Sequence, residues 1–191
     1  MNRRHFNQLT ASIAALAGGS ALANHHEEKG KAFLAKFGPH PGLLHAGPGK
    51  KEGYVAELQF AYDLGFRGWE DNGFNGQKPE VQEAVGAFMK EKNMAFGVSV
   101  ITTGAKAMFN KPTPEQLETI KKDLLRGVEV AKRSGQTFMT MLPGIRDESM
   151  TREEQIAASV DTMKMCCDIV EDAGIVLAQE PLSHGIGGGQ P

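Results

Sequence analysis

A repeated alternation of helix and strand signals constrains this chain more than any other feature of its sequence. Four times, a helical pattern ends in a glycine or an asparagine that a short apolar run follows, at Gly65, Asn93, Gly135 and Gly174. These residue types tolerate the left-handed backbone that commonly ends a helix. The stops lie 28, 42 and 39 residues apart, within reach of one helix–strand unit. Alternating strands and helices predict a parallel sheet with right-handed crossovers.

The individual elements can be predicted by residue range. Thr113 and Thr151 each precede a Gln or Glu by three residues, so two capping boxes predict helices that begin next to them. Pro79 opens a third helix, and a weaker helical pattern covers 51–64. In the helix after Thr151, the residues expected to face the core are Ile156, Val160, Met163, Cys167 and Val170. Strands are expected near 32–37, 66–70, 94–101, 137–142 and 175–179.

Two architectures fit this order: a doubly wound five-stranded sheet, or the first part of a (β/α)8 barrel. Doubly wound proteins that bind nucleotides usually carry a glycine-rich phosphate loop after the first strand. Here the segment 38–49 is rich in proline and histidine and contains no G-x-G-x-x-G pattern. No P-loop Lys–Ser/Thr pair occurs either, which argues against nucleotide binding.

Composition excludes several further classes. The 191 residues suffice for one ordinary domain, with 40% hydrophobic and 23% charged residues. The net charge is −2, and Lys and Arg alternate with Glu and Asp, so no basic face for nucleic acid is expected. The two cysteines, Cys166 and Cys167, are neighbours, which rules out a disulfide framework.

Residues 1–23 have the features of a signal peptide. Arg3 and Arg4 precede an apolar run, and Ala21 and Ala23 form a small-x-small cleavage site. The arginine pair resembles a twin-arginine signal, and an ordinary secretory signal is the alternative. The run is too short for a stable membrane anchor. We expect a periplasmic or otherwise exported protein, with a polar linker at 24–32 and a domain at 33–191.

Polar residues follow the predicted strands, where parallel α/β folds bind their ligands. Glu180 ends an apolar run, and a carboxylate at that position is costly unless it is paired or binds a cation. It could ligate a metal, act as a base, or accept hydrogen bonds from its neighbours. Glu70 and Asn72 end an earlier strand, and Glu70 could equally be a capping or ion-paired residue. His45 and His184 are candidate substrate contacts, with solvated loop residues as the alternative.

Four segments together resemble the hydroxypyruvate isomerase family, which belongs to the xylose isomerase-like TIM barrels. They are F-G-P-H-P-G at 37–42, G-W-E-D-N-G at 68–73, L-P-G at 142–144 and Q-E-P-L-S at 179–183. The resemblance covers residues 33–191 and implies a partial TIM barrel of about five βα units. It also implies an aldose–ketose isomerisation, such as hydroxypyruvate to tartronate semialdehyde.

In that family a glutamate at the end of the fifth strand is a metal ligand or an acid/base residue, and it matches Glu180. The resemblance implies a divalent metal, Mg²⁺ or Mn²⁺, with its other ligands on strands six to eight. This sequence stops after the fifth, so we expect a fragment whose activity requires the remaining strands. An incomplete barrel has open strand edges, and pairing of two copies into a homo-oligomer would cover them.

Three other interpretations stay open at this point. One is a sugar epimerase of the same superfamily, which would also act on a small carbonyl substrate. Another is a non-catalytic periplasmic protein, or a remnant, that binds a small ligand. The last is the doubly wound sheet, in which the first strand is internal and helices cover both faces.

Overall fold

The computed structural model describes residues 33, 36–44, 47, 53–102 and 109–180. The predicted signal peptide and linker, residues 1–32, lie outside this part of the chain. Helices and parallel strands alternate through the rest. In order, the elements are α3 (Tyr54–Asp63), β1 (Gly68–Trp69), the 3-10 helix η1 (Phe74–Gly76), α4 (Pro79–Glu91), β2 (Ala95–Phe96), β3 (Val100–Thr102), α5 (Pro114–Ser134), β4 (Phe138–Met141), α6 (Arg152–Val170), η2 (Glu171–Ala173) and β5 (Val176–Gln179).

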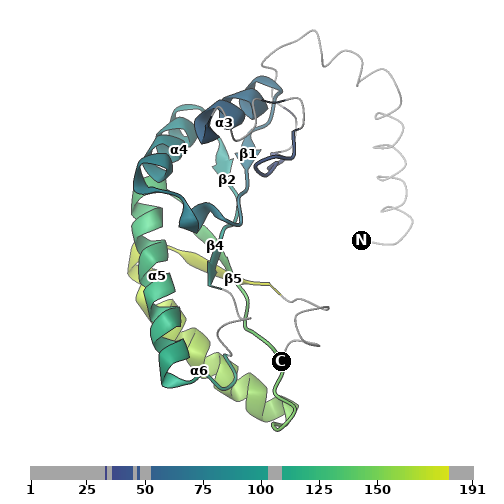
Figure 1. Ribbon diagram of the computed structural model, residues 1–191, viewed down its shortest axis with the longest axis vertical. Coiled ribbons are helices and arrows are strands. Elements are labelled where there is room, and N and C mark those ends of the chain that lie inside the picture. The colour runs from purple at the N-terminus through teal and green to yellow at the C-terminus, as the bar shows by residue number, and fades with distance from the viewer. Residues whose placement is uncertain (1–32, 34–35, 45–46, 48–52, 103–108, 181–191) are drawn as a thin grey trace, which may run out of the picture.

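The order of the strands in the sheet follows their order in the chain. β1 pairs with β2, and β3, β4 and β5 form a second ladder in that order, with every pair parallel. Figure 1 shows the helices as an arc on one side, with the strands along the inner side of that arc. A doubly wound sheet would reverse its strand order and carry helices on both faces. The arrangement is that of a partial TIM barrel, and the described strands do not close it.

The strand predicted at 94–101 is interrupted, because β2 and β3 are two pieces of the same run. The side chain of Gln136, just before β4, forms hydrogen bonds with residues that lie between the two pieces. Its Nε2 donates to the carbonyl oxygen of Gly97 at 2.8 Å, and its Oε1 accepts from Ser99 Oγ at 2.9 Å. These bonds replace ladder contacts and tie the two pieces of the sheet together.

The first predicted strand, near 32–37, is not a regular strand in its described residues, but the segment still runs beside β1. The amide of Glu70 donates to the carbonyl oxygen of Pro39 at 3.1 Å. A Cβ atom at Gly68 would lie 2.9 Å from the carbonyl oxygen of Phe37, so only glycine permits this approach. In the described residues of this segment, the bonds to the neighbouring chain do not form a regular ladder.

The core lies between the sheet and the arc of helices, and α5 is central to it. It packs against both α4 and α6. Gly86 of α4 meets α5 so closely that a Cβ would be 2.6 Å from the Cα of Ser134. A Cβ at Gly127 would lie 2.3 Å from Ile101 Cδ1. The largest apolar side chains buried here are Trp69, Phe74, Phe109, Leu58, Ile101, Ile120, Leu124 and Met139.

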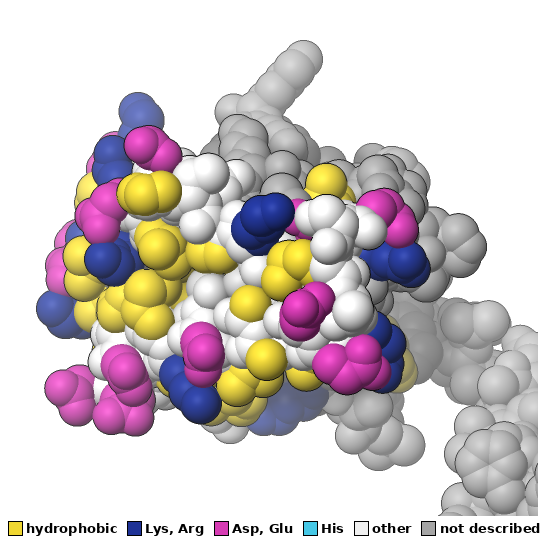
Figure 2. Space-filling view, turned by 90° about the horizontal axis from the view of Figure 1, so that it is seen from below, with side chains coloured by type: hydrophobic (Ala, Val, Ile, Leu, Met, Phe, Trp, Pro, Cys, Tyr) yellow, Lys and Arg dark blue, Asp and Glu magenta, His cyan; other side chains and the backbone are white. Residues whose placement is uncertain are grey.

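The predicted inward face of α6 is correct only in part: Val170 is buried as predicted, and Met163 is partly buried against the core. The buried residues of this helix are Gln155, Ser159, Thr162, Cys166 and Val170, a mainly polar set. Ile156 and Val160 are exposed, as is Cys167. Among the described helices, α5 makes the main contact with α6, and Ile156 and Val160 lie outside that contact. Figure 2, a view from below, shows hydrophobic side chains at the surface between acidic and basic ones.

The inner face of the sheet also exposes apolar side chains. Met139 points toward Gly127 of α5, so its neighbour Phe138 must point to the opposite, inner face. Phe138 and Val176 are in register on β4 and β5, and they are 49% and 51% exposed. In a closed barrel such inward residues are packed as interior layers.

No helix in the described part of the chain is both long enough and apolar enough to cross a membrane.

Candidate functional site

The carboxyl ends of the strands form one rim, and Glu70 lies on it directly after β1. Trp69 points to the helix layer, where its Nε1 donates to the hydroxyl of Tyr54 at 2.8 Å. Successive strand residues point to opposite faces, so Glu70 points to the inner face. There it lies over Gly97, whose added Cβ would be 3.2 Å from Glu70 Cβ and 3.3 Å from Oε2. A larger residue at 97 would displace this half-buried carboxylate.

Glu180 continues the last strand by one residue. Its amide donates to the carbonyl oxygen of Met141 at 3.1 Å, which extends the β4–β5 ladder, and its side chain is exposed. Asn72, also exposed, accepts a hydrogen bond from the amide of Val100 through its carbonyl oxygen at 3.1 Å. The other predicted contacts, His45 and His184, lie outside the described residues. The functional roles of all these residues stay predictions.

The register of the strands separates the two glutamates. Trp69 is level with Phe96, so Glu70 is level with Gly97. Met141 is level with both Thr102 and Gln179, so Glu180 lies beyond the level of Thr102. Between these two levels the run that holds β2 and β3 advances by at least five residues, and it is interrupted between its two pieces. The two glutamates therefore lie at different levels of the sheet, as the tilted strands of a barrel require.

A metal ion would need three or four ligands around it. Among the described residues, no three His, Cys, Asp or Glu side chains gather in a way that could hold one. Glu180 could be one ligand, and the described donor set by itself does not fit a metal centre.

A buried polar cluster beneath the rim was missed by the sequence analysis. Tyr54 of α3 accepts from Trp69 and donates to Asp71 Oδ2 at 3.0 Å, while Asp71 Oδ1 accepts from the amide of Gly73 at 2.8 Å. Burial raises the pKa of Tyr54 above its usual value, so the phenol keeps its proton and remains a donor. The cluster fixes the loop after β1.

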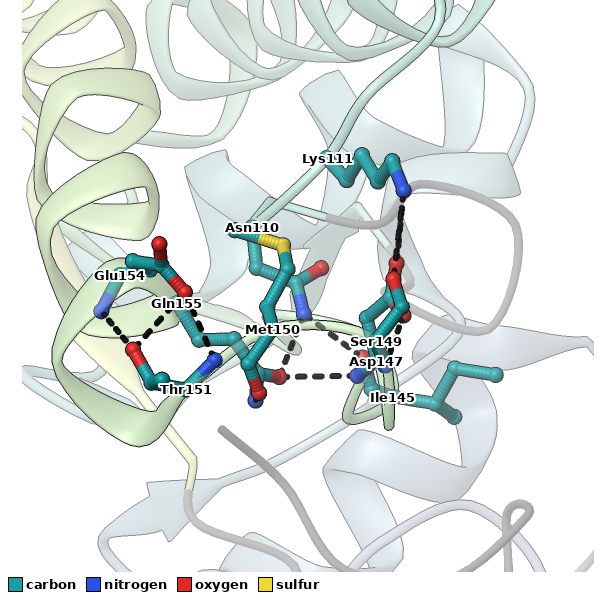
Figure 3. Close-up of polar contacts among 9 residues, drawn as sticks. All are labelled: Asn110, Lys111, Ile145, Asp147, Ser149, Met150, Thr151, Glu154 and Gln155. Carbon is teal, nitrogen blue, oxygen red and sulfur yellow. Dashed lines mark hydrogen bonds and ion pairs between the residues drawn. The ribbon is translucent and has the colours of Figure 1, made fainter.

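A second polar cluster holds the loop after β4 (Figure 3). Gln155 Oε1 accepts from Asn110 Nδ2 and from the amide of Asp147, both at 2.8 Å. Asp147 in turn accepts from the hydroxyl and the amide of Ser149 and lies 3.3 Å from Lys111 Nζ. The bonds from Ser149, assisted by Lys111, lower the pKa of Asp147 to about 2. The carboxylate is therefore charged at neutral pH.

One signal in the sequence could have found these loop-holding residues. Glu57, Gln82 and Gln155 are each the fourth residue of a helix, and each is buried. Glu57 accepts from the amide of Gly42, and Gln82 donates to the carbonyl oxygen of Gln77 at 2.8 Å. A buried Glu or Gln in the first turn thus fastens the loop that precedes its helix.

Comparison with known proteins finds a matching family model and solved structures of similar fold. A family model described as a xylose isomerase-like TIM barrel matches residues 58–189. No curated protein sequence matches the chain.

Three solved structures have a similar fold. A D-tagatose 3-epimerase-like protein is 14% identical, with a TM-score of 0.54, and the match covers 72% of this chain and 52% of that one. For a 3-keto-D-glucoside 4-epimerase from E. coli the values are 18%, 0.54, 77% and 56%. For an L-ribulose 3-epimerase they are 16%, 0.55, 78% and 50%. The matched region spans about half the length of each.

Proposed function

This chain belongs to the xylose isomerase-like TIM barrel family. We propose that it is part of a sugar isomerase or epimerase that acts on a small carbonyl substrate. The observation that carries the proposal is the sequential parallel sheet, which puts Glu70 and Glu180 at the carboxyl ends of their strands. In barrels of this type that rim carries the active site. The chain spans about half of its structural relatives, so we propose that activity belongs to a barrel with further strands after β5.

The chemistry we propose for Glu180 is proton transfer. Its carboxylate would remove the proton from a carbon that bears a hydroxyl next to a carbonyl, leaving an enediolate. Returning the proton to the neighbouring carbon, while the hydroxyl proton passes to the former carbonyl oxygen, completes an isomerisation. Returning it to the other face of the same carbon completes an epimerisation. Glu70, on the inner face of β1, would accept hydrogen bonds from substrate hydroxyls. Asn72, His45 and His184 remain proposed substrate contacts.

Hydroxypyruvate is our first choice of substrate, because G-W-E-D-N-G at 68–73 and Q-E-P-L-S at 179–183 resemble that isomerase family. A ketose epimerase is the second candidate, supported by solved structures of similar fold that are named as ketose epimerases. We also propose a divalent metal, Mg²⁺ or Mn²⁺, with Glu180 as one ligand. Export through the twin-arginine-like signal remains part of the proposal, as does pairing of two copies.

The test is turnover in D₂O by the protein produced from its full reading frame, with and without Mg²⁺ or Mn²⁺. Hydroxypyruvate and D-fructose serve as alternative substrates, and NMR follows deuterium entering a C–H position. We expect Glu180→Gln to reduce the rate by at least about 10²-fold, the usual contribution of a general base. Glu153→Gln, an exposed carboxylate on α6, is the matched control and should keep full activity.

Each outcome decides something. Deuterium incorporation with only one substrate chooses between the isomerase and the epimerase. If neither substrate incorporates deuterium, with or without Mg²⁺ or Mn²⁺, the enzyme proposal fails. A non-catalytic ligand-binding protein then takes its place.

A further inference from the structure

The side chain of Gln155 joins segments that lie far apart in the sequence. It is the fourth residue of α6 and is 1% exposed. Its Oε1 accepts from Asn110 Nδ2 and from the amide of Asp147, both at 2.8 Å, and its Nε2 donates to the carbonyl oxygen of Met150 at 3.2 Å. One buried amide thus contacts the start of α6, the loop after β4 and the segment that leads into α5 (Figure 3).

Asn110 supplies the other half of this junction. It is also buried, and its Nδ2 donates both to Gln155 and to the carbonyl oxygen of Ile145 at 3.3 Å. The preceding residue, Phe109, donates its amide to the carbonyl oxygen of Pro143 at 3.1 Å and accepts from Thr162 Oγ1 at 2.8 Å. The segment 109–110 is therefore bonded both to the loop after β4 and to α6.

The bonds converge on one position of the rim loop. The carbonyl of Ile145 is held by Asn110, and the amide of Asp147 is held by Gln155. These two groups flank Arg146, whose exposed guanidinium pairs with Glu148 at 2.9 Å. The backbone of Arg146 is thus fixed from both sides, while its side chain can exchange one carboxylate partner for another.

We propose that Asn110 and Gln155 are positioning residues, forming a loop clamp with Ile145 and Asp147. The clamp makes the loop after β4 and the segment before α5 one rigid unit and holds Arg146 at the carboxyl end of β4. There the guanidinium would meet an anionic group, a carboxylate or phosphate, of the substrate. This last consequence rests on the proposed isomerase function, whereas the rigidity of the clamp does not.

The first-turn residues of other helices provide a comparison within the molecule. Glu57 and Gln82 occupy the same helix position as Gln155 and are equally buried. Their contacts to the preceding loop are with one backbone group each, Gly42 and Gln77. Gln82 also accepts from Arg133 Nε of α5 at 2.8 Å, but the distant partner of Gln155, Asn110, is itself bonded to the loop after β4. Of these three residues, only Gln155 bonds both the loop after β4 and the segment before α5, so only its loss should loosen both.

The experiment measures hydrogen exchange at two amides by NMR. The Asp147 amide bonds directly to Gln155, whereas the Phe109 amide bonds to Pro143 and does not touch it. Gln155→Met keeps the size of the side chain but removes its hydrogen bonds. We expect exchange at both amides to rise at least about tenfold in this variant. In Asn110→Ala/Gln155→Met, exchange should be no faster than in Gln155→Met, because coupled residues are not additive.

Two further variants separate the clamp from a general loss of stability. Gln155→Glu keeps the accepting oxygen atoms, as the naturally buried Glu57 does, and should restore slow exchange at Phe109 relative to Gln155→Met. Gln82→Met is the matched control and should leave both amides unchanged. If Gln155→Met speeds exchange at Asp147 alone, or if Gln82→Met has the same effect at Phe109, the proposal is overturned.

An activity measurement completes the test. In the protein from the full reading frame, Gln155→Met should raise KM for hydroxypyruvate more than it lowers kcat, and Gln155→Glu should reverse this in part. A wild-type protein without turnover would count against the proposed function and leave the exchange result to decide on the clamp. Normal KM in Gln155→Met with fast exchange would remove the role in positioning Arg146.

Discussion

Helices α5 and α6 begin in the same way but bury opposite kinds of surface. Each opens with a capping box, at Thr113 and at Thr151, in which the threonine and the third helical residue exchange hydrogen bonds. α5 then buries mainly small and apolar residues, whereas α6 buries a polar row and exposes Ile156 and Val160. Local sequence fixes where a helix begins, whereas its neighbours decide which side faces inward.

The difference follows from what lies beside each helix. α5 packs between α4 and α6 and over the strands, so its apolar side chains meet apolar partners. On α6, the buried row faces the segment 109–110, and Gln155 and Thr162 satisfy backbone and side-chain groups there. Buried polar groups need such partners, which is why this row is polar. Five experiments test this difference between the two helices.

The largest effect is expected for the neighbouring cysteines of α6. Burial raises the pKa of Cys166 to about 12, whereas Cys167 is exposed. An ordinary thiol has a pKa of ~8.5, so the thiolate of Cys166 is rarer by roughly three orders of magnitude. Iodoacetamide should therefore modify Cys167 about 10³-fold faster, as measured by mass spectrometry of the peptides. In urea both should react alike, and faster labelling of Cys166 in the native protein would restore the predicted inward face.

A large loss of stability is expected at the buried face of α5. Leu124→Ala should lower the free energy of unfolding by about 3 kcal/mol, because a fully buried leucine leaves a cavity. Leu125, the next residue, is 58% exposed. Leu125→Ala should therefore change the free energy of unfolding by about 0.5 kcal/mol or less. Urea denaturation measures both, and equal losses would contradict the orientation of α5.

On the polar face of α6 the effect should depend on hydrogen bonding. Thr162→Val should cost about 1–2 kcal/mol, because it leaves the buried carbonyl of Phe109 without its donor. Ser159 lies on the same face, and its hydroxyl has no partner among the described residues. Thermal unfolding of Ser159→Ala should show an unchanged or higher Tm. A Tm lowered as much as in Thr162→Val would mean that Ser159 has a partner.

The capping boxes should be equivalent in the two helices. Thr113→Ala and Thr151→Ala should each cost about 1 kcal/mol, since both remove a bond to the amide of the third helical residue. Denaturant titration of the two variants tests this, with Thr113→Ser and Thr151→Ser as controls that keep the hydroxyl. A clear inequality would show that the cap depends on tertiary context.

The smallest effect is expected at the exposed stripe of α6. Val160→Thr changes a methyl to a hydroxyl that water can reach, so stability should stay within about 0.5 kcal/mol. The same change at Val130, which is fully buried in α5, should cost about 1–3 kcal/mol. If Val160→Thr is as costly as Val130→Thr, an apolar partner covers the stripe in solution.

Much of the fold could be predicted from the sequence, because its signals are local. The capping boxes at Thr113 and Thr151 and the left-handed glycines Gly135 and Gly174 lie where the structure has helix ends. The strands follow those stops, so the alternation of helices and strands and the barrel class could be predicted. The break between β2 and β3 could not be predicted, because it depends on a hydrogen bond from Gln136 to Gly97, 39 residues away in the sequence.

The candidate site was predictable only in part. Glu70 and Glu180 could be placed at strand ends from the apolar runs before them, but their offset along the sheet depends on strand register. Tyr54, Asn110 and Gln155 gave no apolar signal, because each is defined by a partner from another segment. Burial of polar side chains needs the folded neighbours to be known.

The match between chain order and strand order has a consequence for biosynthesis. β2 pairs with β1, β4 with β3 and β5 with β4, so each of these strands finds its partner already made when it leaves the ribosome. Domains and their parts generally fold from the amino-terminal end during synthesis, and pairings between neighbours in sequence close only short loops. The edge of the strand made last then stays open until the next strand pairs with it. Such an open edge can also pair with another chain, so it is the place where a chaperone would protect the nascent protein.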